Sequence, residues 1–224
     1  MSRPAAGGGR WVSVDPERLE GWLEGFGGRH GALTCTAGPV AVEVRAADGA
    51  FAGCEVPFPP LPVDPGARYG GLLDHALADR TVGVLLVRLG GFAAGVAEGT
   101  RLVASRVGSR PVHGRAAAGG WSQHRFARRR EGQARTALEA AAEAAAAVLL
   151  PALGGLDAVV AGGDRRAVEA VLADPRLAVL RPLLAARLLD VPDPRRRVLE
   201  DAPRRFRAVS IRVVEPGERP PSPS

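Results

Sequence analysis

The sequence contains no lysine, so all 30 of its basic residues are arginine. Alanine and glycine are abundant in the same chain, a combination typical of a GC-rich genome, and the choice of arginine therefore says little about function. Aromatic residues make up only 4% of the chain, whereas its hydrophobic content of 46% is that of an ordinary globular protein. A length of 224 residues allows one large domain, or a domain with a small appendage.

Cysteine is also scarce, since only Cys35 and Cys54 occur and they form no Cys-x-x-Cys pair or Cys/His cluster. We therefore expect two buried strand cysteines, no zinc site and no cofactor. The N-terminal segment lacks the apolar core of a signal peptide. The longest apolar run is interrupted by Glu143 and Pro151 and is too short to span a bilayer. These absences predict a cytoplasmic protein with no membrane segment.

The positive charge is concentrated in one part of the chain. Residues 101–135 hold nine arginines and a single acid, Glu131, which gives this segment a charge of +8. Because the whole chain carries +6, the remaining residues sum to −2. A local basic patch of this kind favours binding to a polyanion, of which nucleic acid is the commonest.

The first third of the chain predicts a small α+β extension. We expect residues 1–10 to be a disordered tail and residues 11–66 to form a helix followed by a hairpin. Asp15-Pro16 is a typical helix start, and the glycine pair at 27–28 predicts its end. Three β-rich stretches follow, with Asp48-Gly49 as the hairpin turn.

The rest of the chain predicts a larger α+β (mixed α/β) domain over residues 67–214, followed by a disordered tail over residues 215–224. After a short helix, residues 81–109 have the pattern of a three-stranded β-meander. Helical spacing then runs from about Ser122 to Leu150, and further β/α units and a final alternating strand complete the domain. The positions expected to face a core along this helix are Phe126, Ala134, Ala137, Ala141, Ala145 and Val148.

The stretch GGWSQHRFARRREGQA, from Gly119 to Ala134, joins the meander to the long predicted helix. Arg125, Arg128 and Arg129 are spaced i, i+3 and i+4, so they share one side of that helix. Cations at a helix N-terminus oppose the helix dipole, which favours anions there by about 0.3–1 kcal/mol each. Their presence therefore suggests that they bind phosphate.

This block resembles the catalytic domain of eukaryotic and archaeal class-one peptide-chain release factors. Those proteins carry Gly-Gly-Gln, then Ser, then two residues, then Arg-Phe-Ala-Arg. Here the two glycines, Ser122 and Arg125–Arg128 keep that register, while Trp121 takes the place of the glutamine and Gln123 follows two residues later. The resulting Gly-x-x-Gln form is similar to the bacterial Vms-type release-factor-like peptidyl-tRNA hydrolases of ribosome quality control. The resemblance covers about residues 68–200.

The resemblance implies a peptidyl-tRNA hydrolase, a carboxylic ester hydrolase that releases nascent chains from stalled large ribosomal subunits without reading a codon. Its implied partners are large-subunit RNA and peptidyl-tRNA, and we expect a monomer. The implied catalytic residues are Gln123, Gly120 and Ser122. The implied RNA-binding residues are Arg110, His113, Arg115, Trp121, Arg125, Arg128 and Arg129.

Several alternatives stay open on the sequence alone. The block is also consistent with a glycine-rich loop and a solvated helix capped by Ser122, with no chemistry. A related enzyme would cut the tRNA near its 3′ end, and a non-catalytic ribosome- or RNA-binding protein would not depend on Gln123. A serine hydrolase is disfavoured because no Gly-x-Ser-x-Gly elbow surrounds Ser122. The N-terminal segment is too small for a codon-reading domain, which favours rescue over normal termination.

If Arg125, Arg128 and Arg129 bind phosphates, changing all three to alanine should weaken ribosome binding and flatten its dependence on salt. Each lost phosphate contact removes about 0.9 of a unit from the log–log salt slope for duplex nucleic acid. Binding measured across a salt series checks this expectation. An unchanged slope with intact binding would instead favour a solvated helix face.

Overall fold

The computed structural model describes residues 2–5, 8–88, 90–109 and 122–218, without the side chains of Ser2 and residues 122–130. The chain divides into two compact units. Unit 1 comprises residues 1–78 and 206–224, and unit 2 comprises residues 79–205. None of the helices in the described part of the chain is both long enough and apolar enough to cross a membrane.

Unit 1 is built on a six-stranded antiparallel sheet with the strand order β1-β2-β10-β5-β4-β3. The last strand of the chain therefore lies in the middle of the sheet. The strands are β1 (Ser2–Pro4), β2 (Arg10–Val14), β3 (Leu33–Ala37), β4 (Ala41–Ala46), β5 (Phe51–Glu55) and β10 (Val209–Val214).

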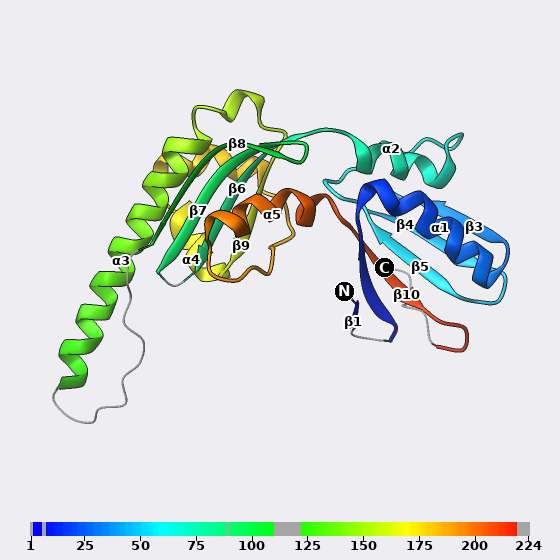
Figure 1. The fold of residues 1–224 in the computed structure, drawn as a ribbon, viewed down its shortest axis with the longest axis horizontal. Helices are drawn as coiled ribbons and strands as arrows, with labels where there is room; N and C mark the ends of the chain where they lie inside the picture. Colours follow the sequence, from blue (N-terminus) through cyan, green and yellow to red (C-terminus); the bar gives the residue numbers. More distant parts are fainter. Residues whose placement is uncertain (1, 6–7, 89, 110–121, 219–224) are drawn as a thin grey trace. The chain divides into compact units, whose positions relative to one another are not determined.

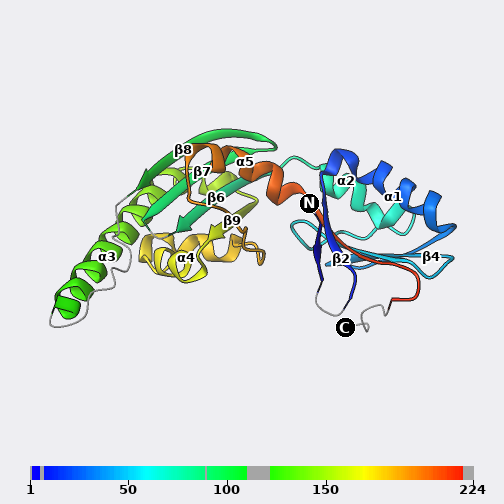
Figure 2. The ribbon, with the colours of Figure 1, turned by 60° about the horizontal axis from the view of Figure 1, so that its bottom comes forward.

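Two helices, α1 (Pro16–His30) and α2 (Leu72–Leu77), cover one face of this sheet, as Figures 1 and 2 show. A 3₁₀ turn, η1 (Arg68–Gly71), leads into α2. The core between helices and sheet is fully buried and aliphatic apart from one aromatic ring. Its largest side chains are Leu19, Leu23, Phe26, Leu72, Val42 and Ile211.

Two details at the start of unit 1 differ from the expectations. Helix α1 starts at Pro16 as expected, but it continues through the glycine pair at 27–28 to His30, with Gly31 as its C-cap. Gly31 is the first residue there with a left-handed backbone (φ +90°), and its N–H donates to the Gly27 carbonyl at 2.8 Å. Residues 2–4, expected in a disordered tail, pair with β2 as strand β1.

The two cysteines have different environments, although both lie in strands as expected. Cys54 in β5 is fully buried, and burial raises the pKa of its thiol to about 12, so it is unreactive. Cys35 is exposed, contrary to expectation, because β3 lies at the edge of the sheet and has a neighbouring strand on one side only. Both cysteines are free thiols.

The placement of β10 changes the division of the chain. From the sequence alone, this strand was expected in a domain over residues 67–214, whereas β10 pairs with β2 and β5 of unit 1. Its alternating Val209, Ile211 and Val213 are buried in the core of unit 1. An alternating pattern specifies which face of a strand is buried, but it does not specify which strands lie beside it.

The point where the chain re-enters unit 1 is fixed by two contacts. The Phe206 ring lies edge-on to Phe58, with ring centroids 5.8 Å apart. The buried Arg207 donates to the Glu17 carboxylate of α1 at 2.8 Å. The pKa of Glu17 is lowered, first by a hydrogen bond from its own backbone and then by Arg207. Aromatic packing and an ion pair thus hold the start of β10 in place.

Unit 2 contains a four-stranded sheet with the order β8-β7-β6-β9. The expected meander is confirmed, since β6, β7 and β8 are antiparallel neighbours. The strand after the long helix, β9, pairs in parallel with β6. The bounds are β6 (Thr81–Arg88), β7 (Gly91–Glu98), β8 (Arg101–Ser109) and β9 (Ala158–Gly163).

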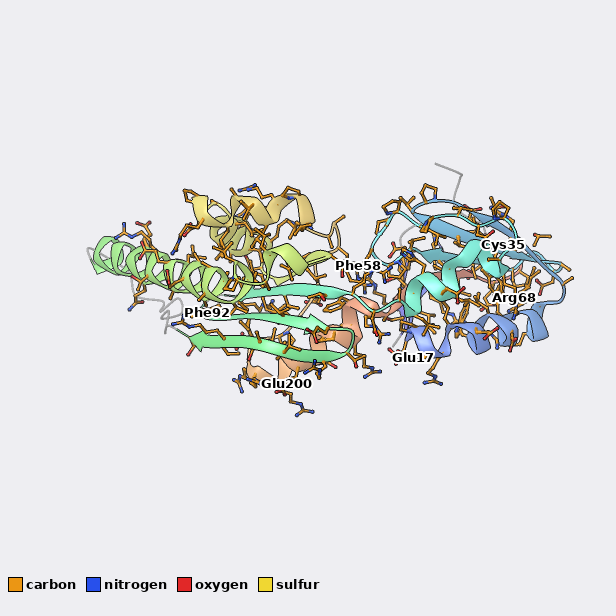
Figure 3. The ribbon with its side chains drawn as sticks, turned by 90° about the horizontal axis from the view of Figure 1, so that it is seen from above. Glu17, Cys35, Phe58, Arg68, Phe92 and Glu200 are labelled. Carbon is orange, nitrogen blue, oxygen red and sulfur yellow. The ribbon has the colours of Figure 1, made fainter. Side chains whose placement is uncertain are left out.

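Helices lie on both faces of this sheet. One face packs against α3 (Ser122–Leu149), α4 (Arg165–Leu172) and the 3₁₀ segment η3 (Pro175–Leu183). Figures 2 and 3 show α5 (Arg196–Arg207) on the opposite face. Accordingly, Leu199 of α5 lies 3.2 Å from the position of a Cβ at Gly95, which points away from α3. A short 3₁₀ turn, η2 (Leu153–Gly155), precedes β9. The α+β class predicted from the sequence is confirmed.

Leu149, the last residue of α3, is fully buried and lies 3.2 Å from the position of a Cβ at Gly83 of β6. Changing Leu149 to alanine should lower the free energy of unfolding of unit 2 by about 2–5 kcal/mol, because it opens a cavity beneath the helix. Urea unfolding followed by circular dichroism measures the change. Val179→Ala is the control, because Val179 is half exposed and its loss should cost less than about 0.5 kcal/mol. Equal effects would contradict the assigned packing.

Candidate functional site

The structure places part of the predicted site. Ser122 is the first residue of α3 and Gln123 the second, while Arg125, Arg128 and Arg129 fall in its first two turns. The side chains of these five residues lie outside the described part of the chain. The remaining predicted residues lie outside it entirely, namely Gly120, Arg110, His113, Arg115 and Trp121.

The second half of α3 is fastened to the sheet by small side chains. Of the expected core positions, Ala134 and Val148 are only partly buried and the side chain of Phe126 lies outside the described part of the chain, whereas Ala137, Ala141 and Ala145 are confirmed as buried. They pack against Phe92 and neighbouring residues of β7, and further alanines and a leucine complete the contact. Alanine allows close approach between helix and sheet, because it carries only a methyl group. The other buried residues of this half are Ala142, Ala144, Ala146 and Leu149.

The first half of α3 extends past the sheet, as Figure 1 shows. Gln123 precedes Ala137, the first of the buried residues described in this helix, by 14 residues, or about 21 Å at 1.5 Å per residue. Between them, the side chains of Glu131, Arg135 and Thr136 are exposed. The fold therefore holds the backbone of Gln123 well away from the core of unit 2.

Both ends of the segment 110–121 are set by regular structure. The segment leaves the sheet after Ser109, whose partner in β7 is Gly91, and it rejoins regular structure at Ser122. The edge strand β8 and the extended half of α3 thus flank the predicted catalytic segment. This is the order of elements expected from the sequence, with a meander, a glycine-rich connection and a long helix.

Charge is distributed unevenly along α3. In its packed half, Glu143 accepts a hydrogen bond from Arg176 at 2.8 Å, and Arg176 also binds Asp174 at 2.9 Å. These contacts raise the pKa of Arg176, and hydrogen bonds from Arg176 lower the pKa of Asp174. In contrast, residues 122–130 contain four arginines and no acid. The start of α3 is therefore a positively charged end without compensating acids in its own sequence.

Unit 2 as a whole is basic and unit 1 is slightly acidic. Unit 2 carries 21 arginines and 13 acidic residues, a net charge of +8, and unit 1 carries −2. Among the described residues, no group of three or more His, Cys, Asp and Glu side chains is placed to hold a metal ion. The candidate site thus combines positive charge with an extended helix end.

Sequence comparison decides the family. The sequence profile of the Actinobacteria/chloroflexi VLRF1 release factor matches residues 80–212, which is more than half of the chain. The chain belongs to this VLRF1 release factor family. The match begins one residue after the start of unit 2 and ends within β10, so it extends further toward the C-terminus than the resemblance drawn from the motif.

Two solved structures are similar to this VLRF1 family member. One is the crystal structure of the archaeal translation termination factor aRF1, with 19% identity and a TM-score of 0.44 over 70% of this chain and 47% of that chain. The other is an archaeal protein, with 18% identity and a TM-score of 0.39 over 70% and 48%. The chain thus spans about half the length of these proteins. No curated protein matches the sequence.

Sequence reasoning missed a second group of arginines in unit 2. Arg88 ends β6, while Arg165 and Arg166 begin α4 directly after β9. Because β6 and β9 are parallel neighbours, with Val87 paired to Gly163, the three arginines lie together at the C-terminal ends of these two strands. The signal in the sequence that could have indicated this group is the Gly-Gly-Asp-Arg-Arg run directly after an apolar strand.

Gly132 lies in the extended half of α3, and a Cβ there would have no neighbour within 4 Å. Gly132→Ala should stabilise this half by about 1 kcal/mol through helix propensity, and so raise amide-exchange protection of residues 122–131 about five-fold. Exchange measured by mass spectrometry checks this. Ala147→Gly in the packed half serves as the control, and it should leave residues 122–131 unchanged. Unaltered exchange in Gly132→Ala would show that helix propensity does not limit this end.

Proposed function

We propose that this VLRF1 family member is a ribosome-dependent peptidyl-tRNA hydrolase that releases nascent chains from stalled large-subunit complexes, as in ribosome quality control. The observation that carries the proposal is the position of Gln123. It lies in the first turn of α3, about 21 Å before the first of the buried residues described in that helix, on an end rich in arginine. Membership of a release factor family supports the same reading.

The chemistry requires little from the protein beyond positioning. Peptidyl-tRNA is an activated ester, and ribosomal RNA already holds it in place. A neutral glutamine amide both donates and accepts hydrogen bonds, so Gln123 can orient the attacking water. The first backbone N–H groups of a helix have no partners within it, so those at Ser122 and its neighbours can stabilise the developing oxyanion. Gly120 permits a close approach of the backbone to RNA.

The proposed partners are large-subunit RNA and the tRNA itself. Arg125, Arg128 and Arg129 share one side of α3 and would bind phosphates, together with Arg110, His113 and Arg115 from the preceding segment. Trp121 would stack on a base. The net charge of unit 1, −2, argues against a second RNA-binding unit and favours release without codon reading. Such a reaction would take place in the cytoplasm.

Gln123→Leu tests the proposal, since it keeps the bulk and removes the amide. Peptide release from stalled peptidyl-tRNA should fall by roughly 10²-fold or more, the scale seen when one transition-state hydrogen-bond donor is lost. Binding to the large subunit should persist because the arginines remain. The matched control is Gln133→Leu, the same change ten residues later in the same helix, which should release peptide at close to the wild-type rate.

Sequencing the 3′ end of the released tRNA separates the two possible reactions. An intact terminal adenosine is the expected result, because ester hydrolysis leaves the tRNA whole. A shortened tRNA would replace the proposal with nuclease activity. Release at the wild-type rate in Gln123→Leu would leave an RNA-binding protein in which Gln123 has no catalytic part.

A further inference from the structure

Unit 2 has a cleft that the proposed reaction does not use. It lies between the turn joining β6 to β7, helix α3 and helix α4, and it encloses about 400 Å³ of empty space, part of it open to solvent. Its cavity volume is about 90 Å³, below the roughly 300–1,000 Å³ of small-molecule pockets, so it is a shallow depression in the surface. Most of the lining is apolar, contributed by Val87 and Phe92 from the sheet, Ala134 and Leu138 from α3, and Ala167 from α4.

The cleft exists because small residues face each other across it. The two helices contribute mainly alanine at this point, so their side chains do not fill the space above the sheet. Phe92, labelled in Figure 3, lies on the side of the sheet that α3 covers. Its ring extends across β8 at Gly108, where a Cβ would come within 2.4 Å of the ring. The floor of the cleft is thus aromatic and aliphatic, and covering it with an apolar group would be favourable because it removes apolar surface from water.

A glycine turn brings Arg88 to the rim of this cleft beside the start of α4. Gly163 has φ +101°, and a Cβ there would lie 2.1 Å from the Val87 carbonyl oxygen and 3.0 Å from Cγ of Arg88. The chain can therefore pass this close only with glycine at 163. The next residue, Asp164, donates its N–H to the Val87 carbonyl at 2.8 Å, which fixes the first turn of α4 next to β6.

The arginines at this edge are uncompensated. Arg88, Arg165 and Arg166 are exposed, and none of them has a hydrogen bond or ion pair within the described part of the chain. The nearest acid in sequence, Asp164, already accepts a hydrogen bond from the Ala167 N–H at 2.8 Å as the cap of α4. Elsewhere in unit 2, by comparison, Arg176 is paired with two acids.

We propose that this cleft binds one nucleotide of single-stranded RNA, with the base on the apolar floor and the backbone phosphates on Arg88, Arg165 and Arg166. A nucleotide matches the site because its flat base is apolar on both faces and its phosphate is anionic. The net charge of +8 on unit 2 attracts RNA in general. An acidic peptide would match the arginines, but it offers no flat apolar group for the floor.

The cleft would act as a second RNA contact, separate from the start of α3 that carries Gln123. Ala134 of its lining follows Gln123 by 11 residues in α3, which corresponds to about 17 Å along the helix. The proposal rests on the proposed function only in taking RNA as the ligand. A contact at this distance would help to orient unit 2 on its RNA substrate while the start of α3 reaches the ester bond of the peptidyl-tRNA.

The first test compares two double variants of the full-length protein by fluorescence anisotropy with a labelled single-stranded RNA of eight nucleotides. Arg88→Gln with Arg166→Gln should weaken binding about ten-fold or more, because it removes the phosphate contacts. The control is Arg195→Gln with Arg197→Gln. These arginines are also exposed and have no ion pair within the part of the chain that the structure describes. Arg195 directly precedes α5 and Arg197 is its second residue, on the other face of the sheet. An equal loss in both variants would overturn the proposal in favour of general electrostatic attraction.

A second test separates the base from the phosphates. Ala134→Leu places a larger apolar side chain in the half-buried mouth of the cleft and suits a helix. It should weaken binding of the RNA several-fold but leave binding of inorganic polyphosphate unchanged, with an unaltered melting temperature as the check on folding. Unchanged RNA affinity would show that no base enters the cleft. Equal binding of a poly-glutamate peptide and RNA would show a general anion surface and overturn the proposal.

The two proposals fail in different ways. Gln123→Leu should bind the eight-nucleotide RNA as tightly as the wild type, since the backbone of Gln123 lies about 17 Å along α3 from Ala134 of the cleft. If peptide release does not depend on Gln123 but the cleft variants lose RNA affinity, the cleft stands and the proposed reaction falls. If the cleft variants bind RNA normally while Gln123→Leu loses release, the reaction stands and the cleft proposal is wrong.

Discussion

The packing of the alanine-rich half of α3 against β7 is the interaction on which unit 2 depends. Ala137, Ala141 and Ala145 are buried against the sheet, and Leu149 closes the contact at the end of the helix. Small side chains make this a close contact, so the helix axis is held firmly by half of its length. The other half can then extend from the sheet as a continuous helix. The packing of the core therefore determines how far the start of α3, with the candidate site, extends from the sheet.

Local signals in the sequence were sufficient for most elements of unit 2. Short β-rich runs bounded by glycine identified β6, β7 and β8, and the helical spacing of alanines identified both the long helix and its buried side. Helix α5 was missed in the sequence, where Pro203 lies inside it and an interior proline usually argues against a helix. It forms because Leu199 and Ala202 are fully buried, which outweighs the local preference.

Contacts between residues far apart in the sequence could not be predicted in the same way. The alternation in β10 predicted a strand, but only the folded chain shows that it lies between β2 and β5. Likewise, Arg88 and Arg165 are far apart in sequence, and the parallel pairing of β6 with β9 brings them together. The candidate site is different, because the motif from Gly119 to Arg128 is local in the sequence. The residue types at these consecutive positions were sufficient to indicate the release factor family.

The position of β10 also has a consequence for how the protein is made. Unit 2 is inserted in the chain of unit 1, and β10 leaves the ribosome after all the other described strands. Until then, β2 and β5 lack the strand that separates them, and Arg207 has not reached Glu17. Domains fold as units during synthesis, usually from the N-terminus onward. Because unit 2 is translated before β10, the five strands β1 to β5 of unit 1 must wait, without the strand that completes their sheet, until the inserted unit has been made.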